Sequence, residues 1–272
     1  MRRQVKIGLA LGSGGARGLA HLGVLARLNE WGVKLHCVAG TSIGAIMGAI
    51  YASGTVDKAI AWAERLDWAG AATLFAEINM PVTGFFTGRR VEERLRKFIP
   101  YGDFSESPVP LATVATDIAT GEEVVLRTGD MMEGVRASYA IPGVFTPVER
   151  EGRQLVDGGL VNPLPISVCR ELGADAVIAV DINLRKGPPG YRRTKKSLKI
   201  MEILANTISI LENEVTRGTL AAQAPDVCVQ PAVGDIFTLD FLTARVAIEA
   251  GYAAADERRA EIEALVKEGR AS

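Results

Sequence analysis

Residues 33–54, VKLHCVAGTSIGAIMGAIYASG, contain the local pattern that decides the fold. The mostly apolar run at 33–39 is typical of a buried strand, and residues 40–42 form a sharp turn. Residues 43–52 then predict a helix, which Gly54 closes. A strand followed at once by a helix is the repeating unit of proteins with a parallel sheet, so this stretch predicts an α/β fold.

The turn within this stretch carries a motif of its own. Gly40-Thr41-Ser42-Ile43-Gly44 fits G-x-S-x-G, and it lies between a strand and a helix, as that motif requires. The turn would lift the Ser42 hydroxyl clear of the sheet, while Gly40 and Gly44 give the backbone room. We therefore interpret Ser42 as a nucleophile. The alternative is a chance match, because the chain contains 29 glycines.

A similar unit precedes this one, with a strand expected at 5–11 and a leucine-spaced helix at 17–31. Two such units in succession predict a mostly parallel central sheet. Further strands are expected at 111–116, 122–127 and 176–182, and further helices at 55–66, 89–99, 131–139, 163–172 and 200–211. Asn162 is expected to cap the helix at 163–172.

The length, composition and charge of the chain indicate a globular protein with one domain and no nucleic-acid partner. With 272 residues, 48% hydrophobic and 23% charged, the chain suits one α/β domain spanning 1–272. The net charge of −1 gives no reason to expect a nucleic-acid partner. Three widely spaced cysteines fit a reducing cytosol. No apolar run reaches the roughly 20 residues of a membrane span, and the N-terminal segment reads as a strand instead of a secretion signal, so we expect a cytoplasmic protein.

A nucleophilic serine needs a base, and the chain has only two histidines. His36 lies within the predicted strand and His21 on the first helix, and neither follows the serine as the histidine of an α/β-hydrolase does. Both are interpreted as structural, which leaves a carboxylate, a lysine or water as the base for Ser42. Asp157 is the best carboxylate, because Gly158 and Gly159 follow it and let its loop turn tightly. An ordinary Asp-Gly turn is the alternative.

The glycine-rich turn at 11–18, LGSGGARG, joins the first strand to the first helix. In an acyl transferase its bare amides would form the oxyanion hole, which stabilises the charge of the tetrahedral intermediate. The competing interpretation is a dinucleotide-binding loop, because Gly12 and Gly14 begin a G-x-G-x-x-G pattern. Arg17 stands where that pattern needs its third glycine.

Taken in order, GSGGARG, GTSIG and DGG resemble the patatin-like phospholipase family, and most closely its short bacterial members. The likeness continues through ASYAIPGVFTP at 137–147 and LVDGGLVNPLP, and covers nearly the whole chain. One departure is Ser13, where many relatives have glycine.

The resemblance implies a three-layer α/β/α sandwich with a central, mostly parallel sheet. It also implies hydrolysis of lipid acyl esters by a Ser-Asp dyad, with no metal or cofactor. Ser42 would be the nucleophile and Asp157 its partner, and the oxyanion hole would lie at Gly14, Gly15, Ala16 and Arg17. We also expect a dry pocket that raises the pKa of Asp157, so that this weak base can work.

Two questions stay open at the level of sequence. The chain could have kept the fold as a non-catalytic lipid-binding or regulatory protein. The basic segment at 192–199, with the amphipathic helix after it, could bind a membrane surface peripherally, or form a solvated loop beside a core-packing helix. The natural lipid and the oligomeric state are not encoded in any motif.

Overall fold

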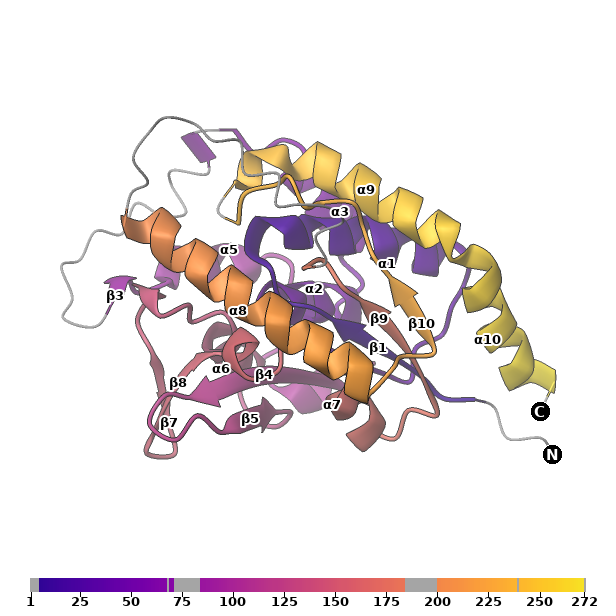
Figure 1. Cartoon of the computed structure of the whole chain (residues 1–272), viewed down its shortest axis with the longest axis horizontal. Helices are drawn as coiled ribbons and strands as arrows, with labels where there is room; N and C mark the ends of the chain where they lie inside the picture. Colours follow the sequence, from indigo (N-terminus) through magenta and orange to yellow (C-terminus); the bar gives the residue numbers. More distant parts are fainter. Residues whose placement is uncertain (1–4, 68, 71–83, 184–199, 239, 272) are drawn as a thin grey trace.

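A computed structural model describes residues 5–67, 69–70, 84–183, 200–238 and 240–271. The predicted basic segment at 192–199 lies outside these residues. The centre of the molecule is an eight-stranded mixed sheet (Figure 1) with the order β10-β9-β1-β2-β4-β8-β7, and β5 pairs with β4. The strands are β1 (Ile7–Leu11), β2 (Cys37–Thr41), β4 (Leu111–Asp117), β5 (Glu123–Leu126), β7 (Val148–Arg150), β8 (Arg153–Asp157), β9 (Ala176–Val180) and β10 (Val227–Val229).

The sheet is parallel from β10 to β4 and antiparallel where β4 meets β5 and β8. Side chains alternate along each central strand. Leu9 and Leu11 of β1 belong to the hydrophobic core on one face, while Ala10 belongs to a second core on the other. Strands buried on both faces explain the continuous apolar runs of the sequence.

Helices cover both faces, which confirms the three-layer α/β/α architecture. One layer contains α1 (Ala20–Glu30), α2 (Ile43–Ala52), α3 (Val56–Ala63), α6 (Met131–Ser138) and α9 (Ala244–Glu257). The other contains α7 (Ile166–Glu171) and α8 (Ile200–Ala222). Figure 1 shows α8 crossing the sheet, with α9 and α1 side by side in the opposite layer. Outside the layers are α5 (Arg89–Leu95), α10 (Arg259–Ala271) and the small sheet of β3 (Gly84–Phe86) and β6 (Gly143–Phe145).

The close approach of α1 and α9 depends on glycines. A Cβ on Gly251 would overlap the carbonyl oxygen of Ala20, and one on Gly23 would overlap that of Ile248. The two backbones are therefore in direct contact, a spacing that only glycine permits. Because α1 continues from the short helix η1 (Gly15–Leu19), this contact supports the glycine-rich loop from behind.

The helix predicted at 163–172 begins later than expected, as α7 starts at Ile166 with Pro165 in the N-cap position. The residue before a proline avoids the helical region, so the helix cannot start upstream of Pro165. The prediction that Asn162 caps it is wrong. Its side-chain amide donates instead to Glu123 Oε1 at 2.9 Å.

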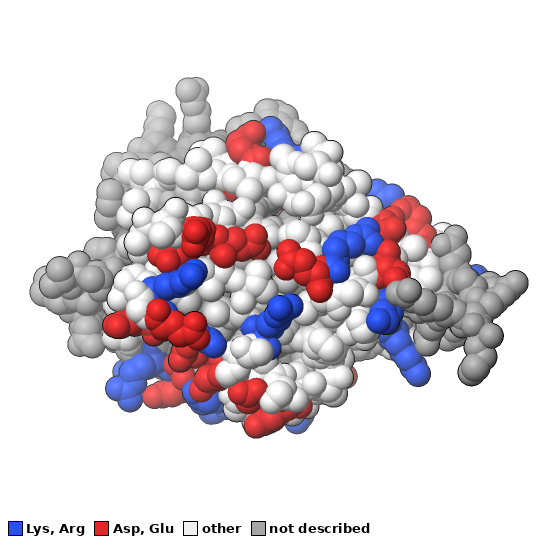
Figure 2. Space-filling model, turned by 90° about the horizontal axis from the view of Figure 1, so that it is seen from below, with Lys and Arg blue, Asp and Glu red and all other residues white. Residues whose placement is uncertain are grey.

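The charged residues are spread over the surface. On the face seen in Figure 2, acidic and basic side chains lie intermixed, with no large patch of one sign. This agrees with the net charge of −1. Within the described ranges, no helix combines the length and the hydropathy that a bilayer span requires.

Candidate active site

Ser42 occupies the turn between β2 and α2 in a conformation that few non-glycine residues adopt. Its φ is 57° and its ψ is −121°. A Cβ at Gly44 would overlap the carbonyl oxygen of Leu11, and one at Gly40 would overlap that of Gly44. The strained turn therefore needs glycine on both sides of the serine, as the motif predicts.

Ser42 and Asp157, which are 115 positions apart in the chain, lie in direct contact. The Ser42 hydroxyl donates to Asp157 Oδ2 at 2.5 Å. Strand β4 makes this possible, because β2 and β8 pair with successive parts of the same edge of β4, while β5 pairs with its other edge. The end of β2, where Thr41 lies opposite Val114, therefore meets the end of β8, where Asp157 lies opposite Ala115. The sheet thus brings the two predicted residues of the dyad to one edge.

Asp157 is held at both ends. Its Oδ1 accepts the backbone amide of Gly159 at 2.8 Å, and its carbonyl oxygen accepts the Thr116 hydroxyl at 2.9 Å. Oδ2 is left for Ser42. The first turn of the short helix η3 (Gly158–Leu160) therefore orients the Asp157 carboxylate.

Burial sets the protonation of this carboxylate. Asp157 is 2% exposed and Ser42 is 4% exposed. Removal from water raises the pKa of Asp157 to about 6, against the opposing hydrogen bonds from Ser42 and Gly159. The shift is in the direction expected from the sequence. It makes Asp157 a better proton acceptor than a solvated aspartate, yet leaves it ionised at neutral pH.

Ser138 is a second serine at the site, and no motif singled it out. Its hydroxyl accepts the amide of Ser42 at 2.9 Å and donates to the carbonyl of Val114 at 2.6 Å. Ser138 therefore links the turn that contains Ser42 to strand β4 by two hydrogen bonds. The only signal in the sequence was its position in the ASYAIPGVFTP stretch, which shows resemblance but no role.

Both histidines lie away from the dyad's chemistry. His21 is buried, and its Nε2 lies 2.8 Å from the Gly12 carbonyl oxygen. Burial lowers the pKa of His21 to about 4, so it is neutral and donates to this oxygen. His36 precedes β2 at the end opposite Ser42. Neither contacts the serine hydroxyl.

Four residues of the glycine-rich loop were expected to form the oxyanion hole. Two of them have a backbone amide that is available to donate within the described structure. Gly14 and Gly15 have positive φ angles of 148° and 60°, and among the described residues their amides have no hydrogen-bond acceptor. The amide of Ala16 is already used, because it donates to the Thr238 carbonyl at 2.8 Å. Gly15 lines the cavity that contains Ser42.

Arg17 acts through its side chain, which is 1% exposed. Its Nε donates to the Gly14 carbonyl at 3.1 Å, and its Nη2 donates to Ser209 Oγ at 2.7 Å. The guanidinium therefore connects the glycine-rich loop to helix α8.

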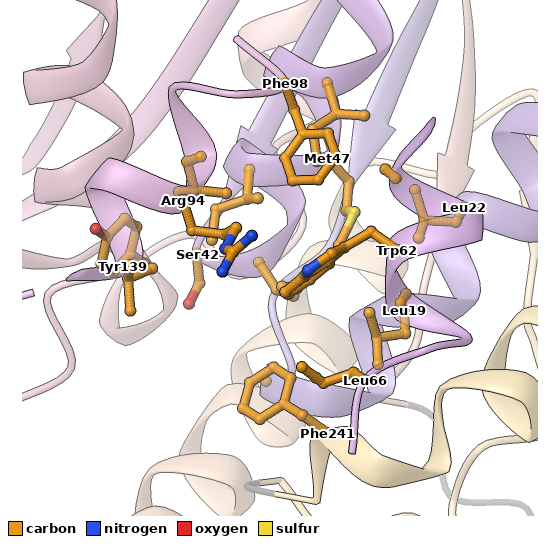
Figure 3. A pocket seen from close by; sticks show the side chains of 18 of the residues that line it. Leu19, Leu22, Ser42, Met47, Trp62, Leu66, Arg94, Phe98, Tyr139 and Phe241 are labelled. Carbon is orange, nitrogen blue, oxygen red and sulfur yellow. The ribbon is translucent and has the colours of Figure 1, made fainter. Parts of the chain in front are cut away.

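A cavity of about 130 Å³ opens beside Ser42 and has an almost wholly apolar lining. Figure 3 shows the large side chains around it, among them Leu19, Leu22, Met47, Trp62, Phe98 and Phe241. Arg94 also lies there, with its guanidinium 5.6 Å from the centre of the Trp62 ring. A smaller cavity of about 20 Å³ is lined by Ser42, Asp157 and Glu212, enough space for one water molecule.

Within the described part of the chain, no three His, Cys, Asp or Glu side chains are grouped as a metal site requires. The fold and the site define an α/β protein with a buried serine–aspartate pair at the edge of a central sheet. The sequence profile of the patatin-like phospholipase family matches residues 9–170, and the chain belongs to that family. This membership replaces the dinucleotide-binding interpretation of the glycine-rich loop.

Relatives of this chain are named as NTE family proteins or as patatin-like phospholipase domain-containing proteins. An uncharacterized NTE family protein of Mycobacterium tuberculosis is 36% identical over 184 residues, which cover 68% of this chain and 51% of that protein. A second is 32% identical over 272 residues, covering 92% and 46%. Human patatin-like phospholipase domain-containing protein 6 is 37% identical over 183 residues, covering 65% and 13%. The chain thus spans about half the length of the mycobacterial relatives.

The fold has a counterpart among solved structures. The crystal structure of VipD from Legionella pneumophila superposes with a TM-score of 0.50 at 14% sequence identity. The match covers 96% of this chain and 67% of that one. It shows a shared fold.

Proposed function

We propose that this chain is a serine lipid acyl hydrolase that cleaves carboxylic ester bonds, with one catalytic domain spanning 1–272. The observation that supports it most directly is the 2.5 Å hydrogen bond from Ser42 to a buried Asp157, beside an apolar cavity. Family membership supports a lipid substrate.

In the proposed mechanism, Asp157 Oδ2 accepts the Ser42 proton as the serine oxygen attacks the ester carbonyl carbon. The carbonyl oxygen becomes an oxyanion that the amides of Gly14 and Gly15 stabilise, each donor being worth about 10²–10³ in rate. The intermediate collapses to an acyl-serine, and the leaving alkoxide takes the proton from Asp157. A water molecule then gives a proton to Asp157 as its oxygen attacks the acyl-serine carbonyl. The second tetrahedral intermediate collapses, the bond to Ser42 Oγ breaks, Asp157 returns the proton to Ser42, and the fatty acid leaves.

The cavity lining supports an acyl chain as the group that is transferred. Its aliphatic and aromatic side chains would remove an alkyl chain from water, which is favourable by about 0.8 kcal/mol for each buried methylene. A longer chain therefore gains affinity until the cavity is full. This predicts a preference for medium or long acyl groups over acetate.

The test is hydrolysis of p-nitrophenyl esters from acetate to palmitate, combined with labelling by an alkyl fluorophosphonate. We expect kcat/KM to rise with chain length by about fourfold per added methylene before it levels off. We also expect the phosphonate to be found on the peptide that contains Ser42. Binding of fatty acid without hydrolysis or labelling would favour a non-catalytic lipid-binding protein.

We also propose that helix α8 contacts the lipid surface. Its inner stripe is small or polar and buried, at Ala205, Ser209, Glu212 and Thr216. Its outer side exposes apolar residues, with Ile203 44%, Ile210 57% and Leu211 52% exposed. Ile203 and Leu211 of the predicted amphipathic stripe thus face outward, while Ile208 of the same stripe lines the small cavity. The same helix lines the small cavity at Ser42 through Ala205, Ile208 and Glu212, so it connects this exposed side to the site.

The double variant Ile203→Ser with Ile210→Ser tests this contact. We expect it to bind phosphatidylcholine vesicles on the order of tenfold more weakly, because two exposed apolar side chains no longer insert. Hydrolysis of a monomeric short-chain ester should not change. Val246→Ser is the matched control, since Val246 is 60% exposed but lies on α9. Equal vesicle binding by all three proteins would rule out this face.

A further inference from the structure

Glu212 is a buried carboxyl that the proposed mechanism leaves without a role. It lies on the inner side of α8, is 5% exposed, and lines the small cavity together with Ser42 and Asp157. A buried carboxyl without neighbours would destabilise the fold, so its contacts should explain why it is there.

These contacts reach both loops of the site. A Cβ on Gly159 would overlap Glu212 Oε1, so the carboxyl lies directly against the glycine whose amide orients Asp157. On the other side, Ser13 of the glycine-rich loop acts on the carboxyl and favours its ionised form. Ser13 is the departure noted in the glycine-rich loop, and its hydroxyl accepts the side-chain amide of Asn183 at 3.3 Å.

The charges around Glu212 favour its protonated form. Burial raises its pKa to about 8, the neighbouring Asp157 carboxylate adds to the rise, and Arg17 and Ser13 oppose it. Asp157 and Arg17 are the charged side chains that act on it within the described residues. His21, beyond the glycine-rich loop, is neutral. At neutral pH the site therefore contains an ionised Asp157, a cationic Arg17 and an uncharged Glu212.

We propose that Glu212 is a positioning residue of this site, whose protonated carboxyl keeps helix α8 against the glycine-rich loop and the Asp-Gly-Gly turn during turnover. The proposal rests on the serine hydrolase function proposed above.

Ionisation of Glu212 would disturb this arrangement. A second carboxylate beside Asp157 leaves two negative charges with Arg17 as their shared cation, and like charges in a dry interior repel strongly. Movement of α8 away from the turn relieves the repulsion. Ser209 then withdraws from Arg17, and the Gly14 carbonyl loses the support that Arg17 gives it. Turnover therefore declines as Glu212 loses its proton.

The experiment is a pH profile of kcat, measured by titrating the released fatty acid. We expect the wild type to decline on the alkaline side with a midpoint near 8. Glu212→Ala should lower kcat at neutral pH by about tenfold, and Glu212→Gln, a neutral isostere, should restore most of it and abolish the alkaline decline. Ser13→Ala should move the midpoint upward, because the Ser13 hydroxyl stabilises the ionised form.

Glu214→Gln is the matched control, as Glu214 is on the same helix but exposed, and its profile should match the wild type. An unchanged alkaline decline in Glu212→Gln would overturn the proposal, as would an unshifted midpoint in Ser13→Ala.

Carbon-13 NMR titration of the Glu212 carboxyl, without substrate, separates this proposal from the proposed function. A Glu212 pKa below about 6 would overturn the positioning role even in an active enzyme. Absence of Ser42-dependent hydrolysis would instead refute the enzyme function, and with it the role of Glu212 in turnover.

Discussion

Asp157→Asn is expected to lower kcat by about 10³–10⁴-fold while the protein stays folded. Asparagine keeps the shape and can still accept the Gly159 amide through its oxygen, but it cannot take the Ser42 proton. Hydrolysis of the preferred ester measures the loss, and circular dichroism verifies the fold. Activity within about tenfold of the wild type would show that another group is the base.

The same substitution should stabilise the protein at alkaline pH. The folded-state pKa of Asp157 is raised to about 6, so between the unfolded value and 6 the folded protein binds more protons. Stability contributed by this group is therefore lost as pH rises through that window. Asp157→Asn avoids the charge and should gain on the order of 2 kcal/mol at about pH 8 but little at about pH 4. Asp235→Asn, at an exposed position, is the control and should gain nothing.

Catalytic activity should increase with pH over the same range in which the stability contributed by Asp157 decreases. Asp157 accepts a proton only when ionised, so kcat of the wild type should fall as pH decreases through about 6. If His21 were the base instead, kcat would fall near pH 4, because the pKa of His21 is about 4. A flat profile between about pH 5 and 7 would contradict the assignment of Asp157 as the base.

Gly251→Ala is expected to have the largest effect on stability of any single methyl addition outside the site. The new Cβ would overlap the Ala20 carbonyl oxygen, which is backbone and cannot rotate away, so α1 and α9 must separate. We expect a loss of about 3 kcal/mol in the free energy of unfolding. Urea unfolding followed by circular dichroism measures it.

Gly218→Ala is the matched control for this prediction. Gly218 is also inside a helix, α8, but a Cβ there meets nothing within 4 Å. Alanine should therefore stabilise the protein by about 0.5–1 kcal/mol, because it has the better helix propensity. Similar effects at both positions would mean that the contact between α1 and α9 adapts, and that the overlap does not determine stability.

Much of the fold was predictable because its central strands are buried on both faces. Such strands appear as short, nearly continuous apolar runs, which is why β1, β4 and β9 were predicted. Strands β7 and β10 have three residues each, which is too short for an alternation of apolar and polar residues to be recognised. The pairing of β8 with β4 joins segments that are far apart in the sequence, so no local pattern predicts it. The helices α9 and α10 were not predicted, although both are amphipathic.

The dyad could be predicted because its parts are local motifs with special backbone needs. The Ser42 turn and the Asp157 turn each need glycine beside the functional side chain. Ser138 and Glu212 lack such a signature, since their roles depend on distant segments that only the fold brings near. Helix α8 departs from the usual rule, because Ile203, Ile210 and Leu211 are exposed while Ser209, Glu212 and Thr216 are buried. Periodicity reveals a stripe but not the direction in which it points.

The position of β9 has a consequence for where the protein can be divided. The family match ends at residue 170, before β9, yet β9 lies between β10 and β1 inside the sheet. A fragment that stops there would contain both members of the dyad, but the edge of β1 that pairs with β9 would be left open, while its other edge would still pair with β2. Open strand edges recruit other chains, so such a fragment should self-associate. The smallest segment that bears the recognisable motifs is therefore shorter than the smallest segment that can remain a monomer.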